Sequence, residues 1–123
     1  MTWSPEQLDR IGGARELEIA VCRTDDTLGP WKPIWVVRVA EEVYVRTWYR
    51  RSTGWFGHAL RSHRARIRVT GVEADVRVED VGVGPSGLRA AVDDAYRKKY
   101  RGGSTSDMVG DEAAATTLRL LRT

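Results

Sequence analysis

Arginine and aromatic side chains alternate near the middle of the chain, at Arg46, Trp48, Tyr49, Arg50 and Arg51. The guanidinium group is a planar fork of N–H donors that matches a phosphate or a carboxylate, and an aromatic face can stack on a flat ring. Together these residue types favour a site for an anionic ligand that carries a ring. The hydroxyls of Ser52 and Thr53 follow at the expected start of a helix, where free N–H groups also suit a phosphate.

Two alternatives stay open for this cluster. The first is a phosphate-binding site, and the second is a solvated loop whose arginines pair with distant acidic residues such as Asp93, Asp94 or Glu112. The surrounding residues 43–72 carry seven arginines and no acidic residue, so they contribute +7 to a net charge of +3 and leave −4 for the rest of the chain. A nucleotide phosphate, a nucleic-acid backbone or a carboxylate substrate would each suit such a stretch.

Part of this charge has a structural explanation. Residues on either side of 70–71 alternate between apolar and charged, which predicts a hairpin with its turn there. In that register Arg66 faces Asp75 and Arg68 faces Glu73 on the outer side of the sheet. Cross-strand pairs of this kind contribute roughly 0.2–1 kcal/mol each, so these two arginines are expected to be structural.

Other catalytic chemistry has little support in the sequence. His58 and His63 are five residues apart, so they do not share one face of a helix as a metal-binding pair would. Cys22 is the single cysteine, which excludes an intrachain disulfide and a thiolate cluster. We therefore predict no metal site, and no residue is assigned a catalytic role.

Length and composition describe one soluble domain over residues 1–123. Apolar residues make up 41% and charged residues 30% of the chain, as in ordinary globular proteins. No run approaches the roughly 20 apolar residues that span a bilayer, and the first residues do not resemble a signal peptide. We expect a cytoplasmic protein without membrane contact.

Spacing of the apolar residues predicts the elements that position the cluster. Helical signals cover a short first helix that opens with Ser4 and Pro5, a second around Trp55 and Phe56, and a third over 88–100, while 101–110 reads as a flexible connector. Strands are expected over residues 17–21, 34–39, 43–48, 66–69, 72–79 and 116–120. This order predicts a mainly β protein, a small antiparallel barrel with short helices at its mouth.

The middle of the chain resembles the FMN-binding split-barrel superfamily. The resemblance rests on a hairpin IWVVRVAEEVYVRTW, a helix that opens with an aromatic pair in TGWFGHALRSH, and a strand RIRVTG. It is nearest to the deazaflavin-dependent nitroreductase branch. The whole chain, from SPEQLDRIG through DAYRKKY to TTLRL, also resembles a family of small uncharacterised bacterial proteins assigned to that superfamily.

The resemblance implies a six-stranded antiparallel split β-barrel that binds FMN or a deazaflavin, with a homodimer as the common assembly. Carried over by position, the cofactor-binding residues would be Lys32, Arg46, Thr47, Trp48, Arg50, Arg51 and Ser52. The expected function is then a flavin- or deazaflavin-binding protein with a redox role on a small organic substrate. The alternative is a cofactor-free barrel that binds a small acidic ligand or a protein partner. Nucleic-acid binding ranks third, because the net charge is only +3 and no nucleic-acid motif is present.

Overall fold

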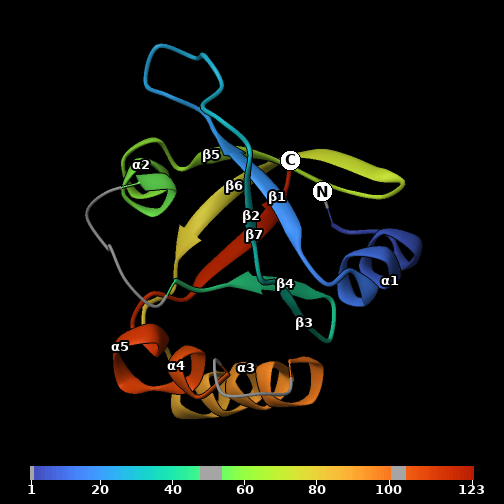
Figure 1. Cartoon of the computed structure of the whole chain (residues 1–123), viewed down its shortest axis with the longest axis vertical. Coiled ribbons are helices and arrows are strands. Elements are labelled where there is room, and N and C mark those ends of the chain that lie inside the picture. Colours follow the sequence, from blue (N-terminus) through green and yellow to red (C-terminus); the bar gives the residue numbers. More distant parts are fainter. Residues whose placement is uncertain (1, 48–53, 101–104) are drawn as a thin grey trace.

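The computed structural model describes residues 2–47, 54–100 and 105–123. In this part of the chain seven antiparallel strands form one sheet, in the order β2-β1-β5-β6-β7-β4-β3. The sheet curls into a half-barrel (Figure 1), which confirms the predicted mainly β fold with short helices. The strands are β1 (Leu17–Val21), β2 (Lys32–Ile34), β3 (Val37–Val39), β4 (Glu42–Val45), β5 (Arg64–Val69), β6 (Val72–Asp80) and β7 (Leu118–Arg122).

The seventh strand arises because the predicted strand 34–39 is really two strands at opposite ends of the sheet. Ile34 on β2 lies opposite Leu17 on β1, whereas Val37 on β3 lies opposite Tyr44 on β4. Val36 lies between them and pairs with no strand; its N–H donates to the Tyr100 hydroxyl at 3.1 Å. Both short strands and the link between them are rich in apolar residues, so periodicity alone could not reveal the break.

The predicted β5–β6 hairpin is confirmed in register. Arg66 lies opposite Asp75 and Arg68 opposite Glu73. Arg66 Nε and Asp75 Oδ1 are 2.9 Å apart, whereas Arg68 forms its ion pair with Glu18 of the neighbouring strand β1, at 3.0 Å. Both arginines therefore form ion pairs on the outer face of the sheet, although the partner of Arg68 is Glu18 and not the expected Glu73.

The turn of this hairpin depends on a glycine. Gly71 has φ +83°, and a Cβ added there would lie 2.5 Å from Nη1 of Arg10. We expect Gly71→Ala to lower the free energy of unfolding by about 1–2 kcal/mol, because an L side chain is strained at positive φ. Urea denaturation measures the change.

The matched control is Gly87→Ala, in the first turn of α3 (Ser86–Lys99), where an added Cβ meets no atom within 4 Å. Alanine has the higher helix propensity, so this variant should be neutral or stabilised by up to about 1 kcal/mol. Equal losses in the two variants would contradict the role given to the turn.

Within the described residues five helices lie around the half-barrel (Figure 1), namely α1 (Pro5–Gly13), α2 (Gly54–Ser62), α3, α4 (Thr105–Val109) and α5 (Asp111–Ala114). The predicted capping box is present in α1, where the Gln7 N–H donates to the Ser4 hydroxyl and the Ser4 N–H donates to the Gln7 side chain. The predicted flexible connector 101–110 is wrong over 105–109, which form α4. Within the described residues, no helix is long and apolar enough to cross a membrane.

The helices pack at different places on the sheet. Both α1 and α3 pack against the edge strand β3, while α2 packs against β1. The barrel interior is filled mainly by the inward side chains of the strands, with Phe56 of α2 and Leu8 and Ile11 of α1 completing the core. A second apolar cluster joins Val37 and Tyr44 to the inner face of α3.

Candidate functional site

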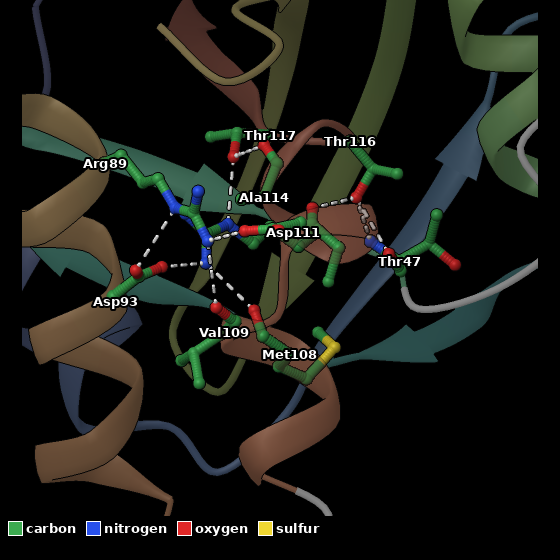
Figure 2. A network of polar contacts seen from close by, with 11 residues as sticks. Thr47, Arg89, Asp93, Met108, Val109, Asp111, Ala114, Thr116 and Thr117 are labelled. Atoms are coloured by element: carbon green, nitrogen blue, oxygen red, sulfur yellow. Dashed lines mark hydrogen bonds and ion pairs between the residues drawn. The ribbon is translucent and has the colours of Figure 1, made fainter. Parts of the chain in front are cut away.

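Arg46, the first cation of the predicted cluster, lies inside the protein. It follows β4 directly, and its side chain is 0% exposed. One nitrogen of the fork, Nη1, donates to the Asp93 carboxylate and to the Met108 carbonyl oxygen at 2.9 Å, and Nε donates to the Thr117 hydroxyl at 2.9 Å. Figure 2 shows that these partners come from α3, from α4 and from the residue that precedes β7.

This contact network is a structural hub, which we call the Arg46 hub. Asp93 is one of the acidic residues that the loop alternative named, and it also lies 3.5 Å from Nε of Arg89. The Tyr96 ring centroid is 5.5 Å from the Arg46 guanidinium carbon, and burial raises the pKa of the Tyr96 hydroxyl. Because its side chain is buried and its Nε and Nη1 already donate to protein groups, Arg46 is not placed to receive a ligand phosphate.

Thr47 is fixed next to this hub through its backbone. Its N–H donates to the Thr116 hydroxyl at 3.0 Å, and that hydroxyl donates to the Thr47 carbonyl oxygen at 2.8 Å (Figure 2). The end of β4 is thus tied to the turn between α5 and β7. The next predicted site residues, Trp48, Arg50, Arg51 and Ser52, lie outside the described residues, as does Thr53.

Lys32, the remaining predicted cation, lines a pocket at the start of α2. The pocket has a volume of about 140 Å³ and lies between the β1–β2 connection and the first turn of α2. Arg46 does not line it, so the structure does not bring these two predicted cations together. The lining residues are Val21, Arg23, Gly29, Pro30, Lys32, Gly54, Trp55 and His58.

The pocket is electropositive because its lining, as far as the structure describes it, includes two cations and no carboxylate. Lys32 is exposed, and no ion pair or hydrogen bond joins its side chain to another of the described residues. Arg23 is held in place by the pocket's own loop, since its Nη1 donates to the Leu28 carbonyl oxygen at 2.8 Å and to the Thr27 hydroxyl at 3.2 Å. One side of the pocket therefore presents two positive charges to a small anion.

His58 supplies a further polar group on the helix side of the pocket. Its Nδ1 lies 3.0 Å from Nη2 of Arg61, one turn further along α2. A guanidinium can only donate hydrogen bonds, so Nδ1 is the acceptor and the ring proton is on Nε2. Trp55 adds an aromatic wall, with its ring edge-to-face on Phe56 at 5.6 Å.

The pocket's residues fit an anionic group of about the size of one phosphate. Lys32 and Arg23 provide charge-assisted donors, and His58 provides a neutral N–H. Ligand pockets that enclose whole drug-sized molecules usually measure about 300–1,000 Å³, so this one would hold only part of a larger ligand. In the described residues, no group of three or more potential metal ligands gathers in one place.

Sequence reasoning missed Arg23, Gly29 and Pro30 as site residues. They belong to a turn-rich connection, residues 22–31, which protrudes above the sheet in Figure 1. This connection is far from α2 in the sequence, and the two come together at the pocket only in the folded protein. The sequence signal for these residues is that Arg23 stands near the start of the loop that leads to Lys32. This signal is weak, because a turn-rich loop is usually only a solvated connection.

A family described as "Uncharacterized protein conserved in bacteria (DUF2255)" matches residues 7–120. A comparison of the sequence with curated proteins finds no match.

Several solved structures similar to this chain have a named ligand or function. The heme storage protein HutZ from Vibrio cholerae is 14% identical with a TM-score of 0.69, over 100% of this chain and 92% of that one. An FAD-binding protein from Mesorhizobium loti is 16% identical with a TM-score of 0.61, over 100% of this chain and 92% of that one. An F420 reductase is 13% identical with a TM-score of 0.57, over 94% of this chain and 91% of that one. At these identities the similarity establishes the fold.

Proposed function

The chain belongs to the bacterial family that matches residues 7–120, and we propose that it is a small-molecule-binding split barrel whose ligand is a phosphate-bearing flavin or deazaflavin. The observation that carries this proposal is the pocket at the start of α2, which has two cations, an aromatic wall and no lining carboxylate. Support also comes from the fold, because similar structures include an FAD-binding protein and an F420 reductase.

In this proposal the phosphate lies between Lys32 and Arg23, and the ring lies at the mouth of the pocket beside Trp55. Residues 48–53 directly precede Gly54, which lines the pocket, so Trp48, Arg50, Arg51 and Ser52 are proposed to complete the ligand set. Arg46 is omitted, since its side chain is buried and its Nε and Nη1 donate to Thr117, Asp93 and Met108. A bound flavin would supply the redox chemistry, and the chain would supply binding and orientation.

Lys32→Gln tests the proposal most cleanly, because the Lys32 side chain makes no ion pair or hydrogen bond within the described residues that the substitution would break. We expect FMN to bind about tenfold more weakly to this variant, since one charge-assisted hydrogen bond is worth about 1.4 kcal/mol. Quenching of flavin fluorescence on titration measures the affinity.

Arg77→Gln is the matched control, because Arg77 is an exposed cation on β6 that does not line the pocket. It should bind FMN like the unmodified protein. If both variants bind FMN equally well, or if Arg50→Ala and Arg51→Ala together change nothing, the ligand does not use this pocket and the proposal fails.

A second candidate function is a cofactor-free barrel that binds a small acidic ligand. The pocket volume of about 140 Å³ favours it, since a compact anion fits entirely where a flavin does not. Under this candidate, inorganic phosphate or a small dicarboxylate should bind with an affinity that depends on Lys32, while neither FMN nor F420 should bind at micromolar concentration.

A further inference from the structure

A groove separate from the pocket lies between α1, β3 and α3. Its volume is about 730 Å³. Apolar side chains form much of the lining, among them Leu8, Val37, Val39, Ala91 and Ala95. Such a surface favours a ligand with an apolar body.

Most of the charged residues that line this groove are neutralised by one another. Arg38 from β3 pairs with Asp9 from α1 at 2.8 Å, and Lys98 pairs with Asp94 on α3 at 2.9 Å. Lys99, the remaining charged residue of the lining, has no carboxylate partner within the described part of the chain. It is half-buried, whereas its neighbour Lys98 is exposed.

The hydrogen bonds of Lys99 are compatible with a neutral amine. Its Nζ donates to the Val36 carbonyl oxygen at 2.7 Å and to the Ile11 carbonyl oxygen at 3.4 Å. An ammonium group has three N–H donors, whereas a neutral amine has two donors and a lone pair. Two carbonyl acceptors therefore satisfy the amine fully and leave its lone pair directed away from them.

Burial shifts the protonation equilibrium of Lys99 toward the neutral amine. Burial lowers the pKa of Lys99 to about 8, from an ordinary value of 10.5. At pH 7 the fraction of neutral amine is then roughly a few hundred times that of an ordinary lysine. The charged groups that line the groove around it are Asp9, Arg38, Asp94 and Lys98, and the Tyr100 ring centroid lies 5.3 Å from Nζ.

We propose that Lys99 is an amine nucleophile that captures aldehydes with an apolar body in the groove. The lone pair of Nζ attacks the aldehyde carbon to form a carbinolamine, which loses water to give an imine. One C=N bond replaces the C=O bond, and the oxygen leaves as water with the two amine hydrogens. No oxidant or reductant takes part, and this inference does not depend on the pocket at α2.

The test uses the unmodified protein and compares Lys99 with its neighbour Lys98. Limiting formaldehyde or benzaldehyde is added with cyanoborohydride to trap the imine, and fragment mass spectra of peptides that contain both lysines locate the product. With formaldehyde at pH 7 we expect Lys99 to react at least about tenfold faster than Lys98. Its rate should level off above about pH 8, while that of Lys98 should continue to rise.

Benzaldehyde tests the groove itself. The rate at Lys99 should saturate with benzaldehyde concentration, as expected for a bound complex, while the rate at Lys98 should increase linearly. The proposal is overturned if Lys99 reacts no faster than Lys98, if it becomes reactive only in urea, or if the benzaldehyde dependence is linear at both lysines.

Discussion

Arg46→Met is expected to lower the free energy of unfolding by about 3–5 kcal/mol. The substitution removes the closer of the two arginine partners of Asp93, whose side chain is only 11% exposed, and leaves that carboxylate with only the longer 3.5 Å pairing to Arg89. It also deprives the Met108 carbonyl and the Thr117 hydroxyl of their donor. These partners come from three separate elements, and the loss should therefore loosen the attachment of α3 and α4 to the sheet. Equilibrium urea denaturation measures the change.

Two further variants show whether the loss of stability comes from breaking the Arg46–Asp93 pair or from removing any arginine. Arg77→Met, on the exposed face of β6, should change stability by no more than about 0.5 kcal/mol. Arg46→Met combined with Asp93→Leu should be less destabilised than the sum of the two single variants, because neither charge is left unpaired. A loss below about 1 kcal/mol for Arg46→Met alone would show that the hub does not stabilise the fold.

Trp3→Ala should cost about 3–5 kcal/mol of unfolding free energy. The Trp3 side chain belongs to the main core, where the residue is 7% exposed, and its indole N–H donates to the Leu120 carbonyl oxygen at 3.0 Å. Truncation would leave a cavity in the barrel core and remove the hydrogen bond that the indole donates to the inner strand β7. Thermal unfolding followed by circular dichroism checks the effect.

Trp3→Phe is the control that retains most of the apolar volume. It should lose the hydrogen bond and part of the packing, at a cost nearer 1–2 kcal/mol. If the alanine and phenylalanine variants are equally stable, Trp3 does not fill the core as described.

Local pattern was sufficient to predict the elements whose partners are near in sequence. The β5–β6 hairpin was predicted in register because one slip would have buried the charges of Arg66 and Arg68. The break at Val36 was not predicted, since it depends on Tyr100, 64 residues further along the chain. Trp3 could not be positioned for the same reason, because its partner Leu120 is 117 residues away.

The same distinction applies to the candidate site, where contacts between residues distant in sequence could not be predicted. Lys32 was identified by position in the family resemblance, but Arg23 joins it only because β1 and β2 bring both residues to α2. Arg46 looked like a ligand-binding cation because sequence shows its charge and not its burial. The acid that neutralises it, Asp93, lies 47 residues away on a helix, and the pairing required the fold.

The most direct test of the central claim compares FMN with riboflavin, which has the same ring and lacks the phosphate. We predict that FMN binds the unmodified protein at least about tenfold more tightly than riboflavin, and that Lys32→Gln removes most of this difference. Fluorescence titrations of the two flavins, carried out side by side at one ionic strength, measure both affinities. Equal affinities for FMN and riboflavin, or no binding of either at micromolar concentration, would contradict a phosphate site at the start of α2.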